Sequence, residues 1–334
     1  MKNIFFSTDS KKIKQVYGDV NKERLAEIGL SANHIFTKND LINHKNDLKD
    51  VTCIFSTWYM PVLTKEEIIE YFPSLKAVFY AAGTVKYFAK PYLENNIRVF
   101  GAGAANAIPV AEFAYAQILL ANKGYYQAQA LYKKRFYKKA KKTAEKHHGN
   151  YCATVGIVGA GGIGSRVMDY LKQHDLRILV FDKFLNEEQI KIRGGQKVSL
   201  ETLFQESDVI SNHLADVPET EGIFNYKLFM SMKENATLIN TGRGRQVVEK
   251  DLARALKKRK DLCAVLDVCR HEPPWPHSPL YLRKNLFLTP HIAGSLNDEQ
   301  LRMGEYMINE YTNFMAGKHC NCEITKSMIE TMAI

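Results

Sequence analysis

The chain has 334 residues and a formal net charge of +10, and at about 150 residues per domain this length favours two domains. Hydrophobic residues make up 46% of the sequence and charged residues 25%. This composition excludes collagen-like, low-complexity and wholly disordered proteins. The excess of Lys and Arg over Asp and Glu leaves a polyanionic partner open as a first hypothesis.

No targeting or membrane signal stands out along the chain. Only three apolar residues, 4–6, precede polar ones at the start, so the core of a signal peptide is missing. The longest apolar run, residues 110–121, contains Glu112 and Gln117 and is too short to span a bilayer, which takes ~20 helical residues. The six cysteines are scattered without zinc-type spacing. We therefore expect a cytoplasmic protein with reduced thiols, no membrane segment and no metal site.

Apolar runs typical of strands alternate with amphipathic stretches over the first hundred residues. This alternation predicts βαβ units and a parallel sheet. The expected strands are 3–6, 51–55, 75–80 and 97–100, and the expected helices are 22–29 and 65–72. A longer helical pattern follows Pro109, where apolar residues recur at steps of three and four. We expect this helix to connect two domains.

A second alternation begins at Ala153. Its expected strands are 154–158, 177–181, 208–211, 236–240, 263–268 and 285–288. Six short strands with helical spacers predict a complete doubly wound domain. The last 39 residues, beginning at Leu296, predict a helix that returns to the N-terminal domain, which is then discontinuous over 1–106 and 296–334.

A dinucleotide-binding pattern follows the expected strand 154–158. Here Gly159 allows a tight turn, Gly161 lets backbone N–H groups approach a pyrophosphate, and Gly164 permits close packing of helix on strand. Asp182 ends the next strand, where a carboxylate would accept ribose hydroxyls and repel a 2′-phosphate, so NAD is favoured over NADP. An ordinary strand–helix turn is the alternative, and the neighbouring Lys183 leaves some NADP tolerance open. The expected cofactor-binding residues from this pattern are Gly159, Gly161, Gly162, Ile163, Gly164 and Asp182.

Three charged residues each follow the carboxyl end of an expected strand: Arg243, Glu272 and His291. Ligands of open parallel sheets bind at this edge, so the three side chains are expected to converge. Beside a nicotinamide they suit the reduction of a carbonyl or its reverse.

Each member of this trio has a distinct chemical task. Histidine exchanges protons near neutral pH, so His291 is the expected acid/base. A carboxylate such as Glu272 fixes the imidazole tautomer, and the guanidinium of Arg243 holds a carboxylate in two parallel hydrogen bonds. From the residues alone the alternatives stay open. They are His213, His271 or His277 as the histidine, Arg245 as the arginine, and a polar-turn role for Glu272.

Together, several segments resemble the D-isomer-specific 2-hydroxyacid dehydrogenases. The matching segments are 81–85, 106–112, 159–164, 240–244, 266–268, 272–273 and 289–294. The resemblance spans most of the chain, and it is the combination of motifs that is specific.

The resemblance implies a role for each matching position. It assigns catalysis to Arg243, Glu272 and His291, substrate binding to Ala82, Gly83, Thr84 and Arg243, and further cofactor contacts to His213, Thr241, Asp267 and Gly294. It also implies a hydride transfer between NAD(H) and a 2-keto acid/D-2-hydroxy acid pair. The implied fold is a Rossmann cofactor domain, 107–295, inserted in a flavodoxin-like substrate domain, 1–106 and 296–334. The implied assembly is a homodimer formed through the cofactor domain.

The sequence also departs from the family pattern. Ala215 and Val217 follow His213 where Pro and Thr are common, Gly242 replaces the usual Ala, and the substrate loop continues as Thr84-Val85-Lys86. Four large residues are candidates to limit the substrate side chain: Trp58, Tyr59, Met60 and Trp275.

Two other functions remain open at this stage. One is an NADPH-dependent reductase of glyoxylate or hydroxypyruvate. The other is a non-catalytic, NAD-sensing scaffold similar to transcriptional corepressors, for which the basic segment 133–146 is the best argument. Because this segment contains no recognised nucleic-acid reading module, we expect a solvated helix or a dimer arm and no nucleic-acid partner.

Overall fold

The computed structural model describes residues 2–31 and 33–331. The chain forms two compact units: unit 1 comprises Met1–Ala107 and Ser295–Ile334, and unit 2 comprises Ile108–Gly294. The expected domain boundaries, 106/107 and 295/296, differ from these by one residue each.

Unit 1 contains a six-stranded sheet in the order β13-β5-β4-β3-β1-β2. Its strands are β1 (Lys2–Phe6), β2 (Ile35–Phe36), β3 (Val51–Ser56), β4 (Ala77–Tyr80), β5 (Arg98–Gly101) and β13 (Glu323–Ile324). The first five are parallel in the flavodoxin-like order 2-1-3-4-5, and β13 adds an antiparallel edge. The guanidinium of Arg98 holds this edge through two 2.7 Å bonds to the Glu323 carboxylate.

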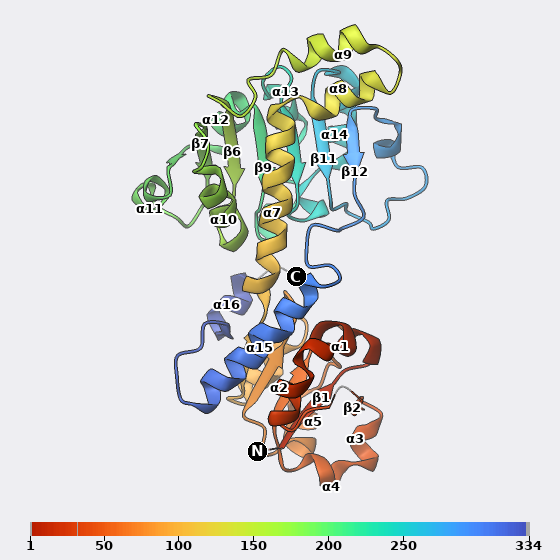
Figure 1. Cartoon of the computed structure of the whole chain (residues 1–334), viewed down its shortest axis with the longest axis vertical. Coiled ribbons are helices and arrows are strands. Elements are labelled where there is room, and N and C mark those ends of the chain that lie inside the picture. The colour runs from red at the N-terminus through yellow and green to blue at the C-terminus, as the bar shows by residue number, and fades with distance from the viewer. Residues whose placement is uncertain (1, 32, 332–334) are drawn as a thin grey trace. The chain divides into compact units, whose positions relative to one another are not determined.

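Helices pack around the sheet of unit 1. They are α1 (Ser10–Tyr17), α2 (Lys22–Glu27), α3 (Asp40–Asn43), α4 (Lys45–Leu48), α5 (Lys65–Tyr71), α6 (Ala89–Glu94), α15 (Glu299–Met315) and α16 (Lys326–Thr331). One of them, α15, comes from the C-terminal part of the chain and contacts α1, β4 and β5. Figure 1 shows α15 beside α1. Gly304 allows this close approach, because a Cβ there would lie 2.4 Å from the carbonyl oxygen of Val16.

Unit 2 contains a seven-stranded sheet in the order β12-β11-β10-β9-β6-β7-β8. Its strands are β6 (Thr154–Val158), β7 (Arg177–Phe181), β8 (Gly195–Lys197), β9 (Val209–Asn212), β10 (Thr237–Asn240), β11 (Cys263–Leu266) and β12 (Leu286–Leu288). All neighbouring strands are parallel. The order places the reversal of the chain between β6 and β9, as in dinucleotide-binding sheets. The expected pair of doubly wound α/β domains is confirmed.

The helices of unit 2 lie around this sheet (Figure 1). They are α8 (Tyr125–Tyr132), α9 (Tyr137–Ala144), α10 (Gly162–Leu171), α11 (Glu187–Ile192), α12 (Leu200–Glu206), α13 (Tyr226–Ser231) and α14 (Glu249–Lys258). All those in the described structure except α9 contribute side chains to the two buried apolar clusters of this sheet. One further helix, α7 (Gly103–Asn122), runs from unit 1 into unit 2. By length and composition α7 alone among the described helices could cross a membrane, although 44% of the window that meets this criterion is buried and core helices meet it too.

The structure differs from the sequence-based expectations mainly in its shortest and longest elements. The strands β2, β8 and β13 have only two or three residues each, too few to show a periodic pattern. Helix α7 begins at Gly103 rather than after Pro109, which lies inside it. All six cysteines, which lie in the described part of the chain, are free thiols.

Candidate functional site

The turn between β6 and α10 depends on glycine at two positions. Gly159 has a φ of +87°, which L side chains rarely adopt, and a Cβ there would lie 3.0 Å from the backbone of His213. A Cβ at Gly164 would lie 2.0 Å from the carbonyl oxygen of Gly159. The first turn of α10 therefore lies directly against the end of β6.

The same turn leaves open space in front of α10. Gly161 precedes the helix and Gly162 begins it, both are exposed, and a Cβ on either would meet no protein atom within 4 Å. A helix of ten residues presents unpaired backbone N–H groups and a partial positive charge at this end. These residues therefore fit the pyrophosphate of a dinucleotide.

Asp182 follows β7 and is buried. Its Oδ2 accepts a 2.8 Å bond from the backbone N–H of Ala160, and its Oδ1 accepts bonds of 2.8 Å from the N–H groups of Phe184 and Leu185. The carboxylate thus links the glycine turn to the loop after β7. The two oxygens together offer about four acceptor positions, so one remains for a ribose hydroxyl.

His213 lies at the end of β9 and is buried and neutral. Its Nε2 lies 2.9 Å from Ser211 Oγ, and its Nδ1 lies 3.4 Å from Thr241 Oγ1. Burial lowers the pKa of His213 to about 3, because an imidazolium would lose its hydration there. Two of the expected cofactor-binding residues, His213 and Thr241, are therefore in contact, and His213 is unsuited to exchange protons near neutral pH.

The backbone of Arg243 is held by two amide side chains. Gln246 Oε1 accepts a 3.0 Å bond from the Arg243 N–H, and Asn240 Nδ2 donates to the Arg243 carbonyl at 3.2 Å. Asn212 joins them, because its Nδ2 donates to Asn240 at 2.8 Å and to Gln246 at 2.7 Å. All three amides are buried. A Cβ at Gly242 would lie 2.5 Å from Asn212 Nδ2, which explains why glycine replaces the usual Ala.

The guanidinium of Arg243 itself is lightly engaged. Its Nη1 donates to the carbonyl of Gly242 at 2.9 Å, and no carboxylate in the described part of the chain pairs with it. Arg245, the alternative arginine, is instead paired with the buried carboxylate of Asp216. Arg243 is therefore the arginine of this segment that is available to a ligand.

The side chains of Glu272 and His291 lie at ion-pair distance from each other. Glu272 Oε2 lies 2.7 Å from His291 Nδ1, and Glu272 Oε1 accepts a 3.1 Å bond from the N–H of Cys269. With Nδ1–H donating to the carboxylate, Nε2 is the ring nitrogen left to exchange a proton. His271 contacts the ring of Trp275 at 5.2 Å, and among the histidines open as alternatives His291 is the one paired with a carboxylate in the described structure.

Asp267 shapes the loop that carries His291. Its Oδ1 accepts bonds from Thr289 Oγ1 at 2.6 Å and from the N–H of Ile292 at 2.9 Å, and its Oδ2 accepts the N–H of Ala293 at 2.8 Å. The backbone N–H of His291 donates to the Asp267 carbonyl at 2.9 Å. These bonds hold His291 at a φ of +54°, an uncommon conformation for a residue other than glycine. The loop continues to Gly294, the last residue of unit 2.

The three charged residues follow neighbouring strands. Arg243 comes after β10, Glu272 after β11 and His291 after β12, and these strands are adjacent and parallel. Their carboxyl ends therefore meet at one edge of the unit 2 sheet. The amides of Asn212 and Gln246 were missed by sequence reasoning, because a buried polar residue at a strand end has no periodic signature.

The expected substrate loop lies in unit 1, after β4. Ala82 is buried, and the N–H of Lys86 donates to Thr84 Oγ1 at 3.4 Å. A Cβ at Gly83 would lie 3.7 Å from Asn106 Nδ2. The substrate-binding role of these residues stays a prediction.

The large residues considered as limits on the substrate differ in their surroundings. Met60 is buried in the core, whereas Tyr59 and Trp275 are exposed. Trp58 is half-buried, with Lys12 Nζ 5.0 Å from its ring centre.

No group of three or more His, Cys, Asp or Glu side chains in the described residues could hold a metal ion.

Comparison with known proteins places the chain beside one family. Residues 115–293 match the family model described as "D-isomer specific 2-hydroxyacid dehydrogenase, NAD binding domain". The chain is 31% identical to a glyoxylate reductase of Korarchaeum cryptofilum over 278 residues, which are 81% of this chain and 82% of that protein. It is 33% identical to a D-3-phosphoglycerate dehydrogenase of Archaeoglobus fulgidus over 224 residues, 67% of this chain but only 42% of that protein.

Solved structures show the same fold across the chain. The apo structure of Rhodotorula graminis D-mandelate dehydrogenase aligns with a TM-score of 0.78 and 20% identity, over 97% of this chain and 98% of that chain. The NAD⁺ complex of Lactobacillus jensenii D-lactate dehydrogenase aligns with a TM-score of 0.73 and 20% identity, over 98% and 100%.

Proposed function

The chain belongs to the D-isomer-specific 2-hydroxyacid dehydrogenase family, and from this premise we propose that it interconverts a 2-keto acid and its D-2-hydroxy acid with NAD(H). The cofactor part rests on the match of residues 115–293 to the NAD-binding domain of the family. The open glycine turn before α10 fits that cofactor, as described above.

One observation carries the catalytic proposal: the Glu272–His291 pair, 2.7 Å apart at the sheet edge that also carries Arg243. A carboxylate on Nδ1 keeps the imidazole in the tautomer that presents Nε2 outward. This is the arrangement that an acid/base needs in order to donate a proton in one direction and accept it in the other.

Each residue then has a defined part. When bound, NADH would supply the hydride for reduction of the keto acid, and NAD⁺ would take it up in the reverse direction. His291 Nε2 gives a proton to the carbonyl oxygen as that oxygen gains charge, and in reverse it removes the hydroxyl proton. Arg243, whose guanidinium has no carboxylate partner among the described residues, holds the substrate carboxylate and polarises the carbonyl. Glu272 stabilises the protonated imidazole.

The environment of Asp182 favours NAD over NADP. Its carboxylate is fixed by three backbone N–H groups and cannot turn away from a 2′-phosphate without leaving those groups unpaired. A negative charge held in this way repels the extra phosphate. An NADPH-dependent reductase would need that charge to be compensated, and Lys183 is the neighbouring candidate.

The test is an NADH-oxidation screen over 2-keto acids graded from glyoxylate to aromatic pyruvates, run with the wild type and with His291→Gln. We expect turnover of at least one substrate and a loss of ~100- to 10,000-fold in kcat for His291→Gln. Unchanged kcat in the variant contradicts the role of His291, whereas no turnover of any keto acid contradicts the proposed reaction and favours a scaffold without catalysis. The relatives' names, glyoxylate reductase and hydroxypyruvate reductase, make small keto acids the first substrates to try.

We also propose that the protein is a cytoplasmic homodimer that associates through unit 2. Exposed aromatic side chains gather on the α8–α9 segment and support this proposal: Tyr125, Tyr132, Phe136 and Tyr137. Sedimentation velocity on the wild type and on a variant with Tyr132 and Tyr137 changed to Ser tests it. A monomeric wild type contradicts the proposal.

A further inference from the structure

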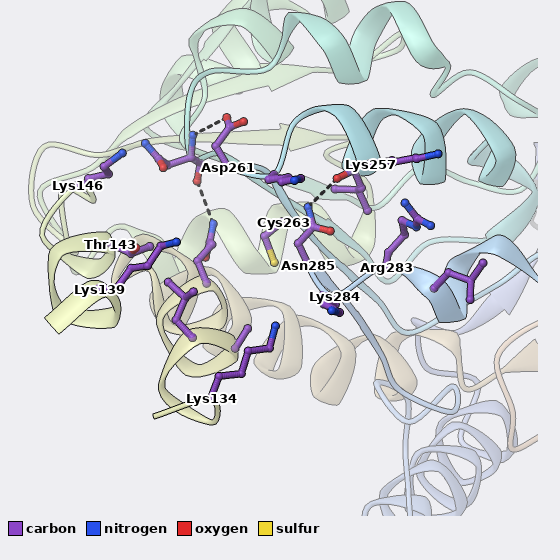
Figure 2. Close-up of a pocket in the computed structure, with 17 residues that line it drawn as sticks. Lys134, Lys139, Thr143, Lys146, Lys257, Asp261, Cys263, Arg283, Lys284 and Asn285 are labelled. Atoms are coloured by element: carbon purple, nitrogen blue, oxygen red, sulfur yellow. Dashed lines mark hydrogen bonds between the residues drawn. The ribbon is translucent and has the colours of Figure 1, made fainter. Parts of the chain in front are cut away.

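A pocket in unit 2 is surrounded by cations that the proposed reaction does not use. It has a volume of about 510 Å³, within the usual range for small-molecule sites. Seven cations line it, and one of them, Lys146, is paired with Glu234. We call it the basic pocket and define it by the other six: Lys134, Lys139, Lys257, Lys260, Arg283 and Lys284. Figure 2 shows the labelled cations arranged around Cys263 and Asn285.

Three separate segments supply these cations. Lys134 and Lys139 come from the turn after α8 and from α9, Lys257 and Lys260 from the end of α14, and Arg283 and Lys284 from the approach to β12. The α8–α9 segment contacts the loop before β10 at both of its ends. Near its start Gln127 Nε2 donates to the carbonyl of Asn235 at 3.1 Å, and after α9 Lys146 lies 3.6 Å from Glu234. The basic pocket is therefore built by tertiary contacts of unit 2.

The positive charge of the basic pocket is not compensated by the protein. None of its six defining cations forms an ion pair with a carboxylate in residues 2–31 and 33–331. The carboxylate that lines the pocket, Asp261, is instead neutralised by Arg259 at 2.6 Å. Like charges gathered around one cavity repel one another, so an anion that enters it gains attraction from several sides.

Two further features describe the interior. Apolar side chains line part of the wall, among them Leu131, Leu256 and Leu282. Two lining polar atoms are buried without any hydrogen-bond partner in the described structure, namely Arg283 Nε and Gln127 Oε1. An orphaned buried donor is costly unless a ligand or water bonds to it. Arg283, one of the six cations, thus has a buried N–H donor that no group in the described structure satisfies.

We propose that the basic pocket binds a small polyanion built of linked phosphate groups, such as an inorganic polyphosphate chain or the phosphates of a nucleotide. Linked phosphates carry several negative charges within a short length, and this matches six uncompensated cations better than a monocarboxylate does. The volume accommodates a few such groups, and the apolar wall can receive a base or another apolar body.

This site is separate from the catalytic edge. Cys263 and Asn285 line the basic pocket at the amino ends of β11 and β12, whereas Asp267 and His291 follow the carboxyl ends of the same strands. A strand of four residues spans ~13 Å at the usual rise. The ligand of the basic pocket therefore does not compete with the cofactor.

The proposal is tested by isothermal titration calorimetry. The whole 334-residue chain is kept in saturating NADH, and anionic probes are titrated into it. The probes are sodium tripolyphosphate, ATP and citrate, at about 150 mM salt so that weak surface attraction is screened. We expect one tripolyphosphate per chain. Tighter binding of ATP identifies a nucleotide as the source of the phosphates, and equal binding identifies the phosphate chain alone.

Charge-matched variants assign the binding to this pocket. Lys257→Glu/Lys284→Glu reverses two of its exposed lysines, and Lys227→Glu/Lys250→Glu makes the same charge change at exposed lysines outside it. We expect the first to weaken tripolyphosphate binding roughly tenfold or more, as the loss of charged hydrogen bonds implies, and the second to leave it unchanged.

Four results overturn the proposal. They are no binding of tripolyphosphate, equal weakening in both variants, citrate binding as tight as tripolyphosphate, and a shift from dimer to monomer in the pocket variant alone. The last would make the basic pocket a contact between two copies. A fifth result, duplex DNA binding that is lost only in the pocket variant, would also overturn the proposal and would replace the small polyanion with nucleic acid.

Discussion

Glu272 Oε2 lies 2.7 Å from His291 Nδ1, and its second oxygen accepts the backbone N–H of Cys269. The carboxylate is therefore anchored on one side and oriented toward the imidazole on the other. Both side chains remain partly exposed, at 40% for Glu272 and 51% for His291. Because an exposed ion pair contributes little to stability, this pair is better understood as a device for orienting the histidine.

Glu272→Gln separates orientation from stability. The amide can keep the bond to Cys269, but its NH₂ group would turn the Nδ1 of His291 into an acceptor and place the ring proton on Nε2. We expect kcat for keto-acid turnover to fall by roughly 100-fold, with the midpoint of urea unfolding and the affinity for NADH unchanged. Steady-state kinetics, urea unfolding and NADH fluorescence titration measure these effects.

Glu201→Gln, at an exposed glutamate of α12, is the matched control and should retain wild-type kcat. If Glu272→Gln also retains wild-type kcat, Glu272 does not orient the base.

Two glycines of the same turn should respond oppositely to alanine. At Gly161 a Cβ would meet no protein atom within 4 Å, and φ is −70°, so Gly161→Ala should fold with wild-type stability. The variant should bind NADH more weakly, because the methyl group enters the space in front of α10. At Gly164 a Cβ lies 2.0 Å from the carbonyl oxygen of Gly159. Gly164→Ala should therefore lower the free energy of unfolding by ~1–3 kcal/mol or more. Thermal unfolding without cofactor and NADH titration distinguish the two, and a destabilised Gly161→Ala would contradict the open turn.

Gly242 should be coupled to the amide network that holds Arg243. A Cβ added at Gly242 would lie 2.5 Å from Asn212 Nδ2 and 2.7 Å from Gln246 Oε1. Gly242→Ala should therefore lower the free energy of unfolding by ~1–3 kcal/mol. It should also raise the KM for the keto acid, because these amides hold the backbone of Arg243. In a Gln246→Ala background the second clash is absent. The same substitution should then cost less, and this coupling is what a double-mutant cycle measures. Strictly additive effects would show that the two positions do not interact.

The sequence predicted the fold of both units and the position of the catalytic candidates, because each rests on a strong local pattern. Alternating apolar runs marked most of the strands, and the spacing of Gly159, Gly161 and Gly164 marked the turn before α10. The reversal of the chain in each sheet then places strand ends together. The strands β2, β8 and β13, of two or three residues each, and the amides of Asn212 and Gln246 were missed, because they depend on contacts between distant segments.

Asp267 shows why the role of a site residue is harder to predict than its position. The family resemblance implies a cofactor contact for it, which stays a prediction, and its two carboxylate oxygens also accept three bonds from the loop 289–293. Its structural task is to shape the backbone around His291. No motif in the sequence distinguishes these two tasks, since both place a carboxylate after β11.

His213 should be the main cause of the fall in the free energy of unfolding as the pH drops below about 6.5. Burial lowers its pKa in the folded protein to about 3, whereas an unfolded histidine titrates near 6.5. Between these values the unfolded chain binds a proton that the folded chain does not, so the free energy of unfolding falls as the pH falls below 6.5. Below pH 6.5 the slope that this one group contributes approaches ~1.4 kcal/mol per pH unit, and above pH 6.5 the group no longer lowers the stability.

His213→Gln removes that titration while leaving an amide able to bond with Ser211 and Thr241. We expect the variant to lose less stability than the wild type between pH 6.5 and 5, by about 1 kcal/mol per pH unit, in urea unfolding followed at each pH. A loss of packing alone would lower the free energy of unfolding by the same amount at pH 6.5 and at pH 5. The prediction therefore concerns the slope of the free energy of unfolding against pH and not its absolute value. His277→Gln, at an exposed histidine, should keep the wild-type slope. Parallel curves for His213→Gln and the wild type would show that His213 is protonated in the folded protein or that its burial is relieved there.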